Sequence, residues 1–205
     1  GITTLWSCIN TSQRPIQNLT PSPIPTIISV ETVVADSDYL SGCRTKYPNS
    51  VKSQIDFKGI YPGVSTKEDL TRILGKPTKI IQVIPSEIEW LYDTDAFFLE
   101  KDLVVAIYTD GQVTLKDYLD LYGCPEIIFA TDLNQHPAGN YKNLLFVYPQ
   151  AGYTIAFNEI TIQLTDIPIQ VTYYTSGTLN DFLSQNEFLL YAIIAKPIFW
   201  HEVFK

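Results

Sequence analysis

Hydrophobic and polar positions recur in the same order twice in the middle of the chain. Residues 63–77 align without a gap on residues 111–125, and both segments have the pattern G-x-x-T-x-x-D-Φ-x-x-Φ-Φ-G-x-P, where Φ is apolar or aromatic. Because the apolar positions lie three and four residues apart, each copy predicts a short amphipathic helix with one buried face. This internal repeat is the strongest pattern in the chain.

Polar residues, glycine and proline mark the ends of these two helices. Thr66 and Thr114 are predicted N-caps, and an Asp three residues after each completes a capping box next to the positive end of the helix dipole. The glycine of each G-x-P, Gly75 or Gly123, is predicted to be the left-handed residue that ends the helix. The pattern therefore predicts two helices of about two turns each.

Runs of β-branched and aromatic residues follow each helix and predict strands. The predicted strands are 78–84, 87–92, 96–99 and 103–108 in the first copy, and 126–130, 143–148, 153–158 and 161–174, broken near 166–168, in the second. A helix followed by a four-stranded antiparallel meander, used twice, predicts an α+β fold of two tandem repeats, each with its own sheet. Residues 178–183 echo the capping box and predict a C-terminal capping helix. The run 187–195 fits a helix or a strand.

The pattern divides the chain into three parts. Residues 1–50 are expected to be an export remnant followed by a tether rich in proline, serine and threonine. Residues 51–110 form the first predicted repeat, and residues 111–205 form the second repeat with the C-terminal cap.

Composition and charge narrow the function. The 205 residues are 45% hydrophobic, with 14 Lys plus Arg against 22 Asp plus Glu and a formal net charge of −8. Such a chain has enough apolar residues for a real core and no basic patch for nucleic acid or an anionic membrane surface. The longest apolar run, 188–195, is too short to span a bilayer.

The three cysteines suggest a location outside the cytoplasm. Residues 5–8, Leu-Trp-Ser-Cys, resemble a bacterial lipobox, which makes Cys8 a candidate lipidation site and the only expected contact with a membrane; the alternative is a thiol or a disulfide partner. Cys43 with Cys124 is preferred as a disulfide over Cys8 with Cys43, and free thiols are the third option.

The chain is poor in residues for catalysis, so we predict that it is not an enzyme and binds no cofactor or metal. His136 and His201 are far apart, and neither has a partner at metal-ligand spacing. A nucleophile pair of Cys124 and His136 is disfavoured because Cys124 occupies a turn position where the first copy has Lys76. Acidic residues in the turns between 93 and 102 are expected to form a solvated hairpin edge rather than a Ca²⁺ site.

The repeat pattern, followed by the Trp-x-Tyr strand at 90–92, resembles the SmpA/OmlA (BamE-like) lipoprotein domain. Two such units in tandem, over residues 55–174, resemble the β-lactamase-inhibitor protein, BLIP. This resemblance implies a non-catalytic extracytoplasmic module that binds a protein partner, as a lipoprotein of the bacterial cell envelope. The alternative that it implies is a secreted inhibitor of an extracellular enzyme such as a β-lactamase or a protease.

The resemblance also places the partner on the open face of the sheets. Alternate strand residues would supply this face, although aromatic residues at such positions also suit a core. If all of the named aromatics are buried, the longer loop at 132–142 becomes the next candidate. The aromatic residues predicted to bind the partner are Trp90, Tyr92, Phe97, Tyr148 and Tyr153.

Overall fold

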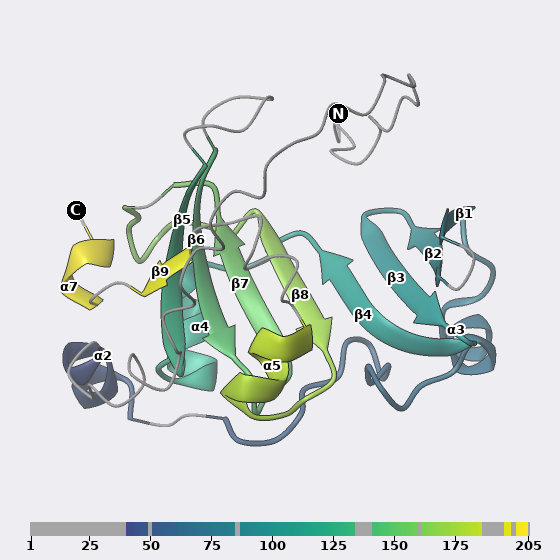
Figure 1. The fold of residues 1–205 in the computed structure, drawn as a ribbon, viewed down its shortest axis with the longest axis horizontal. Helices are drawn as coiled ribbons and strands as arrows, with labels where there is room; N and C mark the ends of the chain where they lie inside the picture. The colour runs from purple at the N-terminus through teal and green to yellow at the C-terminus, as the bar shows by residue number, and fades with distance from the viewer. Residues whose placement is uncertain are drawn as a thin grey trace, which may run out of the picture.

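The computed structural model describes residues 40–48, 51–84, 87–133, 141–159, 161–185, 195–197 and 200–204. Its helices are α2 (Ser41–Lys46), α3 (Lys67–Leu74), α4 (Leu115–Tyr122), α5 (Leu179–Gln185) and α7 (Trp200–Val203). Its strands are β1 (Lys79–Ile84), β2 (Glu87–Tyr92), β3 (Asp95–Glu100), β4 (Leu103–Thr109), β5 (Ile127–Leu133), β6 (Tyr141–Tyr148), β7 (Tyr153–Phe157), β8 (Gln170–Tyr174) and β9 (Ala195–Pro197). The α+β fold class is confirmed (Figure 1).

The predicted helix ends are confirmed in detail. The backbone N–H of Asp69 donates to the side chain of Thr66, whose own N–H donates back to the Asp69 carboxylate, and α4 begins with the same capping box at Thr114. Gly75 and Gly123 end the helices with the predicted positive φ, +81° and +78°, but with ψ of −152° and −163° instead of the ψ of a left-handed helical residue. These ends form as predicted because all their determinants lie within a few residues of one another in sequence.

The two meanders form one sheet, whereas the sequence suggested a separate sheet for each repeat. The strand order among the described residues is β1-β2-β3-β4-β8-β7-β6-β5-β9, and all neighbouring strands are antiparallel. The meanders join where β4 pairs with β8, from Ala106 opposite Tyr174 to Thr109 opposite Val171. Each meander ends in a strand with a free edge, and pairing these two edges satisfies the backbone groups of both.

One side of this sheet, which we call the inner side, is covered by α3 in the first half and by α4 in the second. Leu70 of α3 packs on Trp90 and Phe97, while Leu115 and Leu119 of α4 pack on the β5–β8 strands. The two clusters face the same way because Ile107, Tyr173 and Tyr153 stand opposite one another in register across β4, β8 and β7. The inner side therefore carries the main core of the whole molecule.

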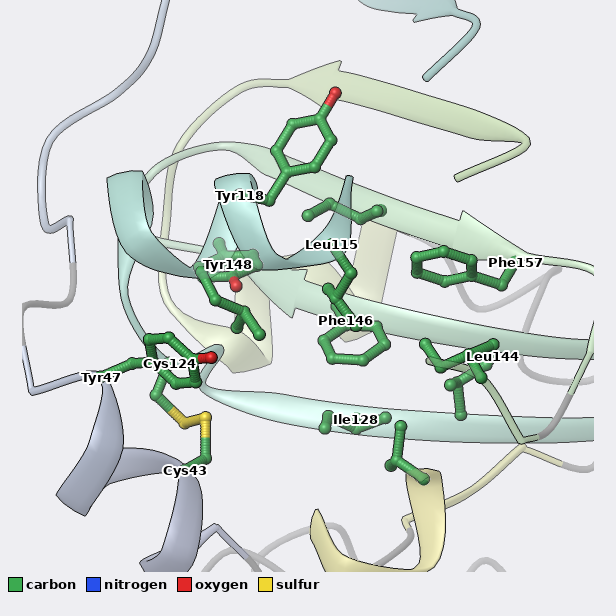
Figure 2. Packing of buried hydrophobic residues seen from close by; sticks show 14 of the residues in the cluster. Cys43, Tyr47, Leu115, Tyr118, Cys124, Ile128, Leu144, Phe146, Tyr148 and Phe157 are labelled. Carbon is green, nitrogen blue, oxygen red and sulfur yellow. A yellow bond between two sulfur atoms is a disulfide. The ribbon is translucent and has the colours of Figure 1, made fainter. Parts of the chain in front are cut away.

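Residues 40–48 belong to this core, although the sequence placed them in the tether. Cys43 and Tyr47 are buried against the second half, and a disulfide bond joins Cys43 to Cys124, directly after α4, with 5.6 Å between the two Cα atoms. Figure 2 shows this bond beside the ring of Tyr47. The disulfide confirms the preferred cysteine pairing. It also explains why the tether prediction is wrong for residues 40–48. The disulfide fixes α2 to a core that is distant in sequence, so no local pattern reveals the contact.

The opposite side of the second half is covered by α5. Leu179, Phe182 and Leu183 of this helix pack on Ile127, Phe129, Val147 and Tyr174. The ring of Phe182 lies 5.1 Å from that of Tyr174. The predicted C-terminal capping helix is thus confirmed, including a capping box in which Thr178 and Asp181 exchange hydrogen bonds.

Several predictions fall outside the described residues. These are the lipidation site Cys8, the segment 1–39, His136 in the loop at 134–140, and most of the run 187–195. Among the described residues, no helix is long and apolar enough to cross a membrane.

Candidate protein-binding surface

The aromatic residues predicted to bind a partner lie mainly in the core, so that prediction is corrected. Trp90, Phe97, Tyr148 and Tyr153 are all on the inner side, with exposed fractions of 5%, 0%, 2% and 1%. Tyr92 is half-buried, and its ring packs edge-on against Phe97 at 5.3 Å. The physical reason is the strand alternation: these aromatics occupy the positions that face α3 and α4, where they fill the core.

These inner aromatics hold the two halves of the molecule together. Phe57 bridges the halves, with its ring 6.0 Å from Phe97 in the first half and 5.2 Å from Tyr173. Tyr173 in turn lies 6.3 Å from Tyr153. Burial raises the pKa of both tyrosines well above its ordinary value, so their phenols stay neutral. They act as packing groups and are not available to a partner.

The other side of the first half presents different residues. Strand alternation and register place Leu91 opposite Ala96, and Phe98 opposite Ala106, on the face away from α3. The ring of Phe98 lies 5.0 Å from that of Tyr108. We call this surface the open face. Its residues are all half-buried, and they are Glu87, Glu89, Leu91, Ala96, Phe98, Ala106 and Tyr108.

No described helix lies over the open face, whereas α5 lies against β7 and β8 on the same side of the sheet (Figure 1). The two surfaces are continuous, because Ala106 of the open face pairs with Tyr174, which packs under Phe182 of α5. On this side of the sheet, α5 therefore covers the second half, and no helix of the described segments covers the first half.

The open face has an apolar centre with an acidic border. Burial raises the pKa of the Glu89 carboxyl, an effect that the nearby Lys79 partly offsets. Burial also raises the pKa of the Tyr108 phenol, and the negative charges of Glu87 and Glu89 raise it further. Apolar and aromatic groups edged by carboxylates are suited to contact with a basic, amphipathic surface.

The described residues offer little for catalysis. No group of three or more His, Cys, Asp or Glu side chains among them could hold a metal ion. The nucleophile pair of Cys124 and His136, which the sequence already disfavours, does not form because the sulfur of Cys124 is in the disulfide bond. His201 lies exposed on α7.

The acidic turns of the first half include one structural carboxylate that the sequence did not reveal. Asp95 is buried, with an exposed fraction of 6%, where a solvated edge was expected. It accepts hydrogen bonds from the Thr109 hydroxyl and from the Lys58 ammonium, both at 2.7 Å. Lys58 lies far away in sequence, so no local pattern could have predicted this ion pair.

No protein-family model matches the chain, and no curated protein matches it. The structure is similar to a cysteine-rich secretory protein from Staphylococcus aureus, with 10% identity, a TM-score of 0.42 and coverage of 68% of this chain and 51% of that one. It is also similar to an extracellular protein containing an SCP domain from Bacillus anthracis, with 11% identity, a TM-score of 0.35 and coverage of 67% and 52%. The chain thus spans about half the length of these proteins.

These comparisons correct the resemblance to the SmpA/OmlA lipoprotein domain and to BLIP, because the similar structures are secretory and SCP-domain proteins. The physical reason lies in what the motif encodes. Its Thr, Asp, Gly and Pro are the determinants of any short, well-capped helix, so they arise in unrelated folds.

Proposed function

We propose that this chain is a non-catalytic, extracytoplasmic module that binds a protein partner through the open face of β1–β4. The observation that carries the proposal is the difference between the two halves of one sheet. The second half has helices on both sides, α4 on one and α5 on the other, whereas no described helix covers the open face. An apolar sheet surface of this kind is stabilised when a partner removes it from water.

The disulfide bond supports the extracytoplasmic location. Cys43 and Cys124 are 81 residues apart in sequence, and both side chains are buried. Disulfides with a structural role of this kind persist in oxidising compartments and are rare in the cytosol.

We also propose that the two halves arose as tandem units of one helix and four strands. A pair of equivalent hydrogen bonds supports this. The Tyr92 hydroxyl donates to the carbonyl of Gly75, and the Tyr148 hydroxyl donates to the carbonyl of Gly123, each at 3.0 Å. In both halves the second strand is thereby fixed to the glycine that ends the preceding helix. The inhibitor alternative rested on the BLIP resemblance and is dropped with it.

Site-specific photo-crosslinking tests the proposed surface. A benzophenone amino acid is placed at Phe98 on the open face or, as a control, at Leu121 on α4, which is 66% exposed. We expect a discrete adduct with a protein of the secreted and envelope fractions from position 98 only, and unlabelled protein should compete for it. An equal adduct from both positions, or none from position 98, would overturn the proposal.

A further inference from the structure

The open face has a counterpart in the second half, which the repeat alignment identifies. Setting Gly75 on Gly123, and residues 90–92 on residues 146–148, places β1 on β5 and β2 on β6. The strand register agrees with this alignment, because two cross-strand pairs on this side of the sheet have exact counterparts. The pair Lys79–Leu91 corresponds to Ile127–Val147, and the pair Ile81–Glu89 corresponds to Phe129–Leu145. The open face therefore corresponds to the surface beneath α5.

A short amphipathic helix covers this counterpart surface. Leu179, Phe182 and Leu183 lie at positions i, i+3 and i+4 of α5, so they form one apolar stripe along the helix. The stripe belongs to one hydrophobic cluster with all four β5 and β6 residues of the two pairs. Such a helix is therefore an element that fits the outer side of a meander with this register.

The open face differs from its counterpart by one charged residue in each pair. Lys79 occupies the position of Ile127, and Glu89 occupies the position of Leu145, while the other member of each pair is apolar in both halves. The centre of a permanent protein interface is depleted of charged residues, because burying them costs solvation. These two charges therefore favour an occupant that binds and dissociates over a permanent layer of the fold.

The charges on the open face also indicate the sign of the occupant. The carboxylates of Glu87 and Glu89 outnumber the ammonium of Lys79, and both glutamates are half-buried. A cation beside them would compensate their partial loss of water. The net charge of −8 attracts basic segments from a distance, and it disfavours a second copy of this chain as the occupant.

We propose that the open face binds a basic amphipathic helix of the partner protein, which presents apolar residues at positions i, i+3 and i+4. This step rests on the proposed function and names the chemistry of the partner. The apolar stripe packs on Leu91 and Phe98, and flanking Lys or Arg residues lie beside the glutamates. The bound helix adjoins α5, because Ala106 of the open face pairs with Tyr174, whose ring packs against Phe182. Binding thus extends the layer that α5 begins on this side of the sheet.

Three peptides with blocked ends, titrated into the full chain and followed by NMR of its backbone amides, test the helix and its charge. The probe is Ala-Lys-Leu-Ala-Lys-Phe-Leu-Lys-Ala-Lys, in which α-aminoisobutyric acid replaces each alanine to favour the helix. The strand control, Lys-Leu-Lys-Phe-Lys-Leu-Lys-Ala-Ala-Ala, alternates apolar and basic residues. The acidic control is the probe with Glu in place of each Lys.

We expect saturable shifts centred on β2, β3 and β4 with the probe, and binding that is roughly tenfold weaker with either control. Added salt should weaken the probe, because its lysines contribute through charge. Equal binding of the probe and the strand control would remove the helix, and equal binding of the acidic control would remove the basic character. Shifts centred away from the open face would also overturn the inference.

Two charge-reversal variants supply a second arm. Glu89→Lys should weaken the probe about fivefold and strengthen the acidic control. Glu68→Lys makes the same change on the exposed side of α3, which covers the inner side of the sheet, and should leave binding unchanged. If Glu89→Lys does not fold, the three peptides on the unaltered chain still decide. A dimer in sedimentation that Glu89→Lys dissociates would assign the open face to a second copy and overturn the inference.

The crosslink from position 98 separates the failure of this inference from the failure of the proposed function. Mass spectrometry of the adduct should locate the crosslink in a basic helix of the partner. A crosslink to a strand or to an acidic segment of a partner would remove the helix and keep the open face as a binding surface. Binding of the probe without any protein adduct would keep the preference for a basic helix and overturn the proposed function. An adduct with another part of the same chain would overturn both.

Discussion

Removing the bond between Cys43 and Cys124 should cost this fold a large part of its stability. The bond joins residues 81 apart in sequence, so it closes a loop that includes the entire first half of the sheet. In the chain-entropy description, a loop of this size destabilises the unfolded state by about 4.5 kcal/mol at 25 °C. Small domains have a total free energy of unfolding of about 5–15 kcal/mol, so the double variant Cys43→Ala/Cys124→Ala should be only marginally stable.

Urea unfolding of three samples separates the crosslink from the packing of the sulfur atoms. These are the oxidised protein, the reduced protein and the double alanine variant. The reduced protein keeps both buried thiols, so its loss measures the crosslink, and the further loss in the alanine variant measures packing around two side chains that are 0% and 3% exposed. The m-value should rise on reduction, because an unfolded chain without the crosslink exposes more surface.

The reduced protein should loosen first around α2. Arg44 and Tyr47 belong to the segment that the disulfide fixes to the core, and the ring of Tyr47 contacts Trp200 at 6.2 Å. Trp200 fluorescence should therefore change before the sheet unfolds. A loss below about 1 kcal/mol on reduction would show that the hydrophobic contacts of α2 alone keep it in place, and would refute the assigned role of the crosslink.

Three further predictions concern the helix ends and one close contact. Thr66→Ala and Thr114→Ala should each lower the free energy of unfolding by about 1 kcal/mol in urea titrations, with Thr→Ser as the control that keeps the cap. The backbone N–H of Thr66, with Arg72 and the Thr66 hydroxyl, lowers the pKa of Asp69 to about 2 from 3.8. Asp69 therefore stabilises the fold above pH 3.8, and this contribution is lost as the pH falls through about 2. Asp69→Asn should remove that part of the dependence of stability on acid pH. Gly111→Ala would place a Cβ atom 2.2 Å from the Pro168 carbonyl oxygen and should cost about 3 kcal/mol in melting experiments, whereas Gly75→Ala meets no atom within 4 Å and should cost about 1 kcal/mol through its φ of +81°; equal losses at the two glycines would contradict this account.

The elements that the sequence predicted are those with local determinants. The capping box at Thr66 and the glycine at 75 act over three or four residues, and the turns between strands are marked by residues that prefer them. The strand predicted at 161–174 forms only from Gln170, as β8, because the proline at 168 ends the preceding segment; residues 161–169 form no strand. Such features could be found without any knowledge of the fold.

The features that the sequence did not predict depend on contacts between distant segments. Periodicity indicates that Phe97 and Phe98 lie on opposite sides of β3, but it does not tell which side α3 covers. The aromatic residues predicted to bind the partner, Phe97 among them, lie mainly in the core of the structure. The sequence signal that could have reversed the assignment is the pair of glutamates at 87 and 89, because carboxylates on the same strand face as Leu91 mark the side in contact with solvent.

The contrast between the two halves follows from one segment at the end of the chain. The segment after β8 supplies α5 to one side of the second half and β9 to its outer edge, so both incomplete surfaces of that meander are covered by the chain itself. Among the described residues no equivalent segment follows β4, because the chain passes from Thr109 to the capping box at Thr114 within five residues. Within the described ranges, the first half therefore has no helix over its open face. The second half indicates what covers such a surface, a short amphipathic helix, and this is the form in which we expect a partner to bind the open face.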